Sequence, residues 1–225
     1  MAIIVALLAM LMMSILGAAL VLTTSSEATI AANFRTAREG LYAADAAVEL
    51  AIAHLGATPD WNPILEGAAQ SPFVDGPPAG ARTLADGSAL DLGETLNVLN
   101  CRKVTACSAS ELAASTAQRP WGANNPVWRL FVYGPLSSLL QAHAVRSVYY
   151  VIVLAADDPS ENDGNPLRDG DDEANAGSGV LELRAEAFGP RGTRQVVELT
   201  VARPTAEAGQ PGLRVLSWRQ IGKVW

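Results

Sequence analysis

The chain has 225 residues, a length that fits one or two domains. Apolar residues make up 49% and charged residues 17%, a composition that disfavours intrinsic disorder of the chain as a whole. The formal net charge is −7, whereas a protein whose main partner is nucleic acid usually presents a basic face, so we expect no nucleic-acid partner. Two histidines and two cysteines are too few for a multi-histidine or multi-cysteine metal site, which excludes a zinc-finger scaffold.

Residues 1–26 are predicted to form an apolar helical region. Within residues 1–22, Ser14 is the only polar side chain, and a run of about 20 apolar residues can cross a bilayer as a helix. Secretory signal peptides and ordinary membrane anchors carry basic residues beside the apolar segment, but no lysine or arginine precedes Arg35. We therefore expect that a basic leader has been removed and that Met1 begins the mature chain. An ordinary initiator Met1 is the alternative.

The helical pattern continues through residues 27–56. Six apolar residues follow one another at steps of 4, 7, 7, 4 and 3, which is the spacing of one helix face. They are Ile30, Phe34, Leu41, Val48, Ile52 and Leu55. We predict that this face packs on a globular region and that the helix ends near Gly56, a typical cap residue. The hydroxyl residues 23–26 mark the place where the helix could bend or unwind.

The amphipathic half of this helix carries a recognisable pattern, EATIAANFRTAREGLYAADAAVELAIAHL. Its matching residues are Glu27, Ala31, Asn33, Arg35, Arg38, Ala43, Ala44, Asp45, Ala46 and Ala47. With the apolar segment before it, this sequence resembles the N-terminal helix of PilX-type minor pilins of type IV pili. The resemblance covers residues 1–55, about a quarter of the chain. It implies that a membrane peptidase removes a leader and that Met1 becomes methylated.

The resemblance also implies where the chain acts and what it contacts. A PilX-like subunit is held in the inner membrane as a single-pass protein and then joins an extracellular surface filament. Its N-terminal helix would contact other pilin-like subunits. The inner-membrane pilus assembly machinery and a tip adhesin are further expected partners. Whether such a filament serves motility or cell adhesion is left open.

A structural role at the start of the filament is the function we expect. Shaft pilins usually carry a glutamate at the fifth mature position, where this chain has Val5 if Met1 is the mature start. PilX-like subunits often lack that glutamate, so we expect a minor pilin that primes or caps assembly. The alternatives are a repeating shaft subunit and a membrane-anchored periplasmic binding module. No hydrolase, metalloprotease or nucleotide-binding fingerprint is present, and we expect no enzyme.

Residues 57–126 are rich in glycine, proline, alanine and serine, and we predict a variable, loop-rich region. A short helix is expected over Ala109–Gln118, after a serine that can cap it. Cys101 and Cys107 enclose five residues. Because the pilin resemblance places both outside the cytoplasm, we expect a disulfide that braces a loop.

Residues 127–225 are predicted to form an antiparallel sheet region. Segments with period-two alternation are Val127–Tyr133, Val145–Leu154, Val180–Phe188 and Thr193–Ala202, with a hairpin turn at residues 189–192 and Leu213–Ile221 as a fifth strand or edge. We expect Trp128 and Trp218 to lie in the core. The fold class is therefore α+β, a long N-terminal helix packed as a spine on an antiparallel sheet, which is also the pilin fold that the resemblance implies.

The acidic loop 157–179 is the best candidate for a ligand site. Calcium takes six to eight oxygen ligands, and carboxylates and amides that alternate along a loop can supply them. The candidate ligands are Asp163, Asn165, Asp169, Asp171, Glu173 and Asn175. The EF-hand pattern fails, because its mid-loop glycine is Ala174 and its closing glutamate is Val180. A solvated loop is the alternative, and Asp157 and Asp158 are equally suited to cap a turn.

Overall fold

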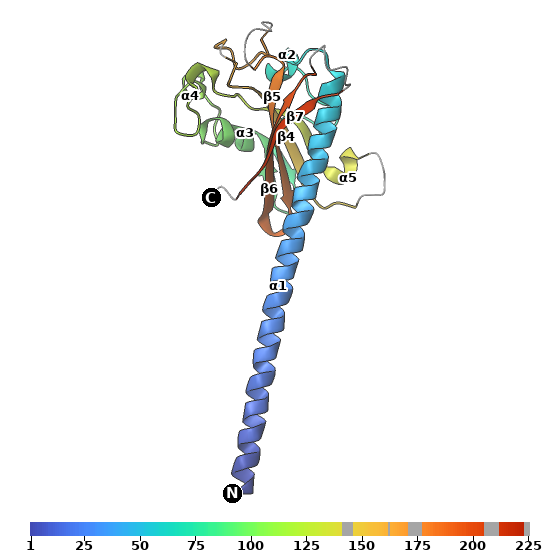
Figure 1. Cartoon of the computed structure of the whole chain (residues 1–225), viewed down its shortest axis with the longest axis vertical. Helices are drawn as coiled ribbons and strands as arrows, with labels where there is room; N and C mark the ends of the chain where they lie inside the picture. The colour runs from blue at the N-terminus through green and yellow to red at the C-terminus, as the bar shows by residue number, and fades with distance from the viewer. Residues whose placement is uncertain (141–145, 162, 171–176, 205–211, 223–225) are drawn as a thin grey trace. The chain divides into compact units, whose positions relative to one another are not determined.

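The computed structural model describes residues 1–140, 146–161, 163–170, 177–204 and 212–222 (Figure 1). Contacts divide the chain into two units, Met1–Glu39 and Gly40–Trp225, and each unit is described here by itself. The helix α1 (Ala2–Ala57) provides the helical residues of the first unit and the first element of the second.

The first unit is the N-terminal part of α1, and its residues 1–31 are all exposed. The hydroxyl stretch does not interrupt the helix, although the sequence marked it as a place for a bend. Thr23 Oγ1 donates to the carbonyl oxygen of Ala19 (2.8 Å), and Ser26 Oγ donates to that of Leu22 (3.0 Å). Because these side chains bond to the preceding helical turn, they leave the main-chain ladder intact.

In the second unit, α1 packs against one face of a β-sheet. Its buried positions are Gly40, Leu41, Ala43, Ala44, Ala47, Val48, Ala51 and Leu55. Ala44, Ala47 and Ala51 have no exposed surface, and such small side chains let the helix axis approach the strands closely. The approach is also close at Gly40, where an added Cβ would lie 2.9 Å from the Gln195 side chain.

The sheet has five antiparallel strands arranged in the order of the sequence. They are β3 (Arg129–Pro135), β4 (Tyr150–Asp157), β5 (Val180–Gly189), β6 (Thr193–Ala202) and β7 (Arg214–Ile221). A short 3-10 turn, η2 (Pro190–Gly192), closes the β5–β6 hairpin at the predicted place. The predicted α+β class, a long helix on an antiparallel sheet, is confirmed. The second strand starts later than predicted, at Tyr150, and Val145 lies outside the described residues.

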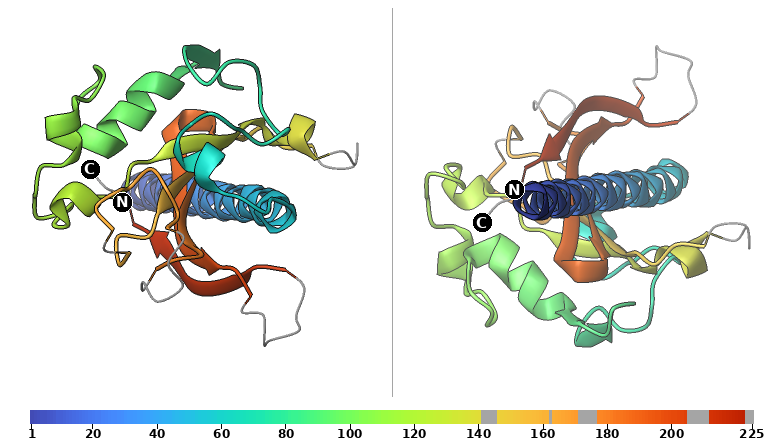
Figure 2. Two further views of the ribbon diagram at one scale, coloured as in Figure 1. Left: turned by 90° about the horizontal axis from the view of Figure 1, so that it is seen from above. Right: turned by 90° about the horizontal axis from the view of Figure 1, so that it is seen from below.

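A second hydrophobic cluster covers the opposite face of the sheet. Side chains alternate along β4, so that Val151, Val153 and Ala155 face α1 while Tyr150, Ile152 and Leu154 face the other way. The helix α3 (Leu92–Cys101) contributes buried Leu92 and partly buried Leu96 and Leu99 to this second cluster. Figure 2 shows α3 and the C-terminal part of α1 on different sides of the strands.

Residues 57–126 contain more regular structure than their composition indicated. The elements are α2 (Asn62–Leu65), β1 (Ala81–Thr83), β2 (Ala89–Asp91), α3, α4 (Ala109–Leu112) and η1 (Gly122–Asn124). The helix expected over Ala109–Gln118 ends at Leu112, and its Ser108 side chain accepts from the Glu111 amide as an N-cap. A further short helix, α5 (Leu136–Leu139), follows β3.

Candidate functional site

The most extensive exposed apolar surface of the described residues lies on α1. Large apolar side chains between residues 3 and 22 are between 56% and 76% exposed. They include Ile3, Ile4, Val5, Leu7, Leu8, Met10, Leu11, Met12, Met13, Ile15, Leu16, Leu20, Val21 and Leu22. Among the described residues, α1 is the one helix long and apolar enough to cross a membrane. Contiguous apolar surface on this scale marks a site of contact with lipid or with other proteins.

The predicted packing face divides into exposed and buried members. Leu41, Val48 and Leu55 are buried in the core, and Ile52 is half-buried against it. Ile30 and Phe34 are instead 68% and 64% exposed. The buried positions of α1 begin only at Gly40, so the same helical spacing continues beyond the part of the helix that the sheet covers.

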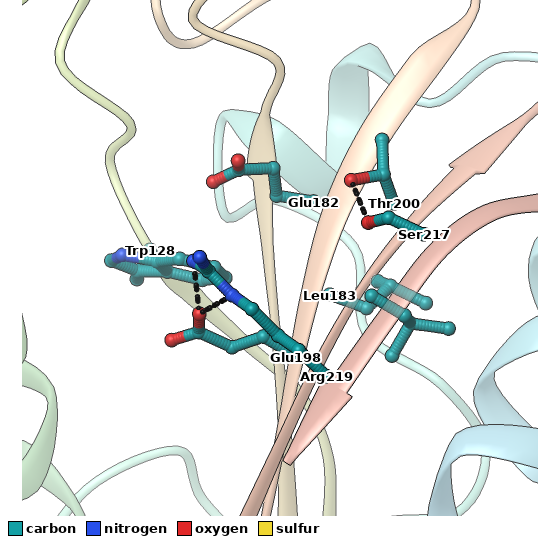
Figure 3. Close-up of a pocket in the computed structure, with 8 residues that line it drawn as sticks. Trp128, Glu182, Leu183, Glu198, Thr200, Ser217 and Arg219 are labelled. Atoms are coloured by element: carbon teal, nitrogen blue, oxygen red, sulfur yellow. Dashed lines mark hydrogen bonds and ion pairs between the residues drawn. The ribbon is translucent and has the colours of Figure 1, made fainter. Parts of the chain in front are cut away.

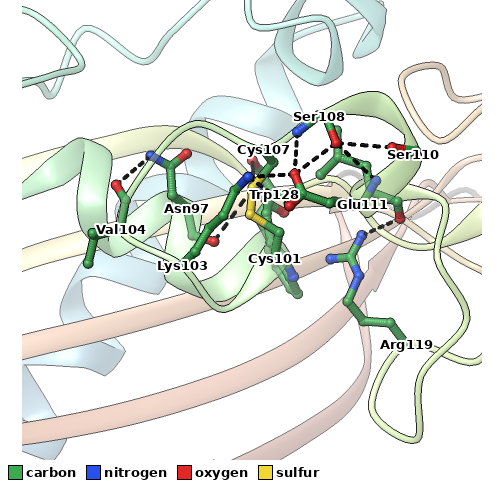
Figure 4. Close-up of a disulfide and its surroundings, with 12 residues drawn as sticks. Asn97, Cys101, Lys103, Val104, Cys107, Ser108, Ser110, Glu111, Arg119 and Trp128 are labelled. Atoms are coloured by element: carbon green, nitrogen blue, oxygen red, sulfur yellow. Dashed lines mark hydrogen bonds and ion pairs between the residues drawn. A yellow bond between two sulfur atoms is a disulfide. The ribbon is translucent and has the colours of Figure 1, made fainter.

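The structure contains a disulfide between Cys101 and Cys107, whose Cα atoms lie 5.9 Å apart. It closes a loop between the end of α3 and the start of α4 (Figure 4). Lys103 Nζ lies 2.6 Å from a Glu111 carboxylate oxygen across this loop, and Ser108 also bonds to that side chain. The Lys103 hydrogen bond, helped by Ser108, lowers the pKa of Glu111 to about 2. The cysteines therefore belong to a braced surface loop and not to a reactive centre.

The acidic loop is only partly described, and three of its predicted calcium ligands, Asp171, Glu173 and Asn175, lie outside the described residues. Asp163 and Asn165 are exposed, and Asp163 Oδ1 accepts from the Asn165 amide (2.7 Å) in a local turn. Only Asp169 of the described candidates joins a group of converging carboxylates. Its neighbours there are Asp157 and Glu161, which the alternating pattern of the sequence did not select.

We call Asp157, Glu161 and Asp169 the acidic cluster. One oxygen atom from each carboxylate lies within 4.8 Å of the others, and Asp157 and Glu161 are only 4% and 1% exposed. Burial, with the charges of Glu161, Asp169 and Asp163, raises the pKa of Asp157 to about 8. Burial also raises the pKa of Glu161. Such an arrangement can hold a cation between the carboxylates or share a proton among them.

A cavity of about 240 Å³ opens over β5, β6 and β7 (Figure 3). Arg219 donates to Glu198 through two nitrogens at 3.0 and 2.6 Å beside the Trp128 ring. Burial, reinforced by Asp158 and Glu198, raises the pKa of Glu182 to about 7. Trp128 is buried as expected, whereas Trp218 is 49% exposed, because β7 is an edge strand. The cavity contains an ion pair and opens to solvent at the edge strand β7. Among the described residues that line it, no nucleophile stands beside a general base.

Comparison with known proteins gives one match, over the N-terminal part of the chain. Residues 1–49 match the family model described as PilX N-terminal, and the match ends inside α1. No curated protein and no solved structure matches the chain. The apolar surface and the start of the packing face lie within the matched residues, while the sheet, the disulfide and the acidic cluster lie outside them.

Proposed function

We propose that the chain is a minor subunit that primes or caps a type IV pilus-like filament, because residues 1–49 match the family model described as PilX N-terminal. The observation that supports it most directly is the exposed apolar half of α1. A surface without polar groups can pack against lipid tails first and against neighbouring apolar helices afterwards. The proposed locations are therefore the inner membrane before assembly and the cell-surface filament after it.

The charge pattern of α1 favours a priming or capping role over a shaft role. Residues 1–26 contain no Asp, Glu, Lys or Arg. A carboxylate buried in an apolar filament core needs a partner charge, and such a pair fixes the axial register of successive subunits. A subunit without that carboxylate can still be the first to enter a filament, with other subunits added after it. It lacks the usual charge pair by which a subunit docks onto one that was added earlier. Other pilin-like subunits and the inner-membrane assembly machinery are the proposed partners, with a tip adhesin as a further one.

The proposed role is structural and not catalytic. The second unit has a sheet that is packed on both faces, with the C-terminal part of α1 in the core on one of them. It also has short surface helices and a loop closed by the disulfide. These features suit a rigid body that contacts neighbouring subunits at one end of a filament. Cleavage of a leader and methylation of Met1 stay predictions of the same proposal.

Electron microscopy of cells that lack the chain tests this proposal. We expect fewer filaments per cell, with the remaining filaments close to normal in length, because assembly starts less often. The wild-type gene should restore the number. Leu11→Asp, which places a charge in the exposed apolar surface, should not restore it, whereas Thr29→Asp, on an exposed part of α1 beyond that surface, should. Filaments of normal number but reduced length would instead contradict the priming or capping role.

A further inference from the structure

Two buried members of the acidic cluster, Asp157 and Glu161, have carboxylate oxygens without the partners that buried charges require. Asp157 Oδ1 and both carboxylate oxygens of Glu161 accept no hydrogen bond from the described residues. No ion pair among the described residues reaches Asp157 or Glu161 either, and Arg203 Nε lies 3.9 Å from Asp169 Oδ2. Buried carboxylates are destabilising unless they are neutralised, paired or bound to a metal. The cluster therefore needs a positive species at its centre.

Each member of the cluster is held in place by contacts outside the acidic loop. Asp157 is the last residue of β4 and pairs with Leu181 of β5. The carbonyl oxygen of Glu161 accepts from Asn124 Nδ2 (2.6 Å). The backbone N–H of Asp169 donates to Asn62 Oδ1 (2.8 Å), and Asp169 Oδ1 accepts from the Gly179 amide (2.6 Å). The three carboxylates are thus positioned by the sheet, η1 and α2 and not by the local loop alone.

Two glycines let the chain close around Glu161. A Cβ at Gly170 would overlap Glu161 Oε1, so no other residue fits there without movement of the carboxylate. Gly177 has φ +98, and a Cβ at that position would lie 2.6 Å from the Glu161 backbone nitrogen. A side chain at Gly177 would therefore clash with the Glu161 backbone, and one at Gly170 would displace the Glu161 carboxylate. The loop therefore encloses the Glu161 carboxylate with backbone, as a built site does.

The chemistry of the donors selects the kind of ion. Three carboxylates offer up to six oxygen atoms and, when all are ionised, carry three negative charges, which Arg203 offsets only in part. Zinc favours nitrogen and sulfur ligands, whereas calcium takes six to eight oxygens in flexible geometry. Magnesium demands a small octahedral shell and keeps several waters, which suits an enclosed group of carboxylates less well.

We propose that Asp157, Glu161 and Asp169 bind a calcium ion at the end of β4. The bound ion links Asp157, at the end of β4, to Glu161 and Asp169 of the acidic loop. Because Glu161 is bonded to Asn124 and Asp169 to Asn62, the ion also stabilises the contacts of the loop with η1 and α2. Of the ligands expected from the sequence, this set includes Asp169. Asp171, Glu173 and Asn175 lie outside the described residues. The site depends on the second unit alone and stands whether or not the chain primes a filament.

Thermal unfolding of the full chain in detergent tests the site. After treatment with a chelator, added CaCl2 should raise the Tm progressively with the logarithm of its concentration, because calcium binds the folded state. Glu161→Gln and Asp157→Asn should each abolish that rise. Each should also raise the Tm in chelator above that of the wild type, because one buried repulsive charge is gone. This opposite effect distinguishes the loss of a ligand from a folding defect.

The control is Asp158→Asn, in the same turn. Its side chain bonds to the Ser160 amide (3.1 Å) and hydroxyl (2.7 Å) and is not part of the cluster, so this variant should keep the calcium response. Equal Tm values for the wild type in calcium and in chelator would overturn the proposal and leave a shared proton as the neutralising species. A full calcium response in Glu161→Gln, or an equal response to magnesium, would also overturn it.

Discussion

Asn100 forms two hydrogen bonds with the backbone of a single residue, Trp128. Its Nδ2 donates to the Trp128 carbonyl oxygen (3.1 Å), and the Trp128 N–H donates to its Oδ1 (2.9 Å). Asn100 is 5% exposed and lies next to the last residue of α3, while Trp128 directly precedes the edge strand β3. The amide side chain therefore satisfies the backbone N–H and carbonyl group of the residue just before β3, and it fixes α3 on the sheet.

Asn100→Ala should destabilise the second unit. Truncation leaves a buried backbone donor and acceptor without partners, so we expect a loss of about 2–4 kcal/mol in the free energy of unfolding. Denaturant unfolding of the full chain in detergent measures it. Asn97→Ala is the matched control, because that side chain donates to Val104 O in an exposed position and its loss should cost under about 1 kcal/mol. Similar losses in both variants would contradict the role assigned to the Trp128 pairing.

Ala47→Leu should weaken the packing of α1 on the sheet. Ala47 has no exposed surface, and three added carbon atoms must displace the strands, at about 1–3 kcal/mol. Ala53→Leu changes an exposed position of the same helix by the same atoms and should leave the stability nearly unchanged. Thermal unfolding of both variants checks the prediction. A stable Ala47→Leu variant would mean that the helix does not lie as close to the sheet as described.

Removal of the disulfide should lower stability without loss of the fold. The bridge closes a short loop, and the entropy of closing such a loop in the unfolded chain is worth about 2 kcal/mol. We expect the Cys101→Ser, Cys107→Ser double variant to unfold at correspondingly lower denaturant. The loop keeps its Lys103–Glu111 ion pair and the bond from Asn97 to Val104. Reduction of the wild type should reproduce the shift, and an unchanged midpoint would show that the bridge constrains nothing.

Glu182 should make stability depend on pH. Burial, with Asp158 and Glu198 adding and Arg219 opposing, raises its pKa from 4.5 to about 7 in the folded chain. The folded state therefore holds this proton where the unfolded state has lost it, and stability falls as pH rises from about 4.5 to about 7.

The measurement is the difference in stability between the wild type and Glu182→Gln at fixed calcium. Because glutamine does not titrate, the wild type should lose stability relative to the variant as pH rises from 5 to 8. A difference that stays constant over that range would show that Glu182 does not titrate there.

The long helix and the sheet could be predicted because apolar residues recur in the sequence with the periods of a helix face and of strands. The steps from Leu41 to Leu55 reflect burial of one helix face, and β4 to β6 are rich in the apolar and β-branched residues that a sheet covered on both faces requires, so both signals are visible in the sequence. The exposure of Ile30 and Phe34 does not follow in the same way. Spacing shows that residues share a helix face, but it does not show how far along the helix a partner extends.

The helix α3, which packs on the face of the sheet opposite α1, was not predicted because its apolar pattern is short. Leu92, Leu96 and Leu99 follow steps of 4 and 3, and Asp91 caps α3 through the Glu94 amide (2.9 Å). One glycine and two asparagines interrupt this pattern, which is only ten residues long. An Asp86-Gly87 pair likewise marks the β1–β2 hairpin, although both strands have only three residues.

The acidic cluster could not be read from spacing. Asp157 and Glu161 approach because a turn follows β4, and Asp169 joins them because its backbone is tied to Asn62, far away in the chain. The sequence prediction of calcium ligands was instead based on acidic residues that alternate along the loop. Ligand sets built by tertiary contacts leave no periodic trace, whereas local ones such as EF-hands do.

Quantitative mass spectrometry of sheared filaments tests the central claim most directly. Filaments are collected from the organism that produces the chain, and the molar ratio of this chain to the shaft pilin is measured with labelled peptides from the second unit. A subunit that primes or caps assembly should be present at a low ratio that falls as filaments grow longer, because each filament carries few copies. If the chain is the most abundant filament protein, or if its ratio is independent of length, the priming or capping role is wrong.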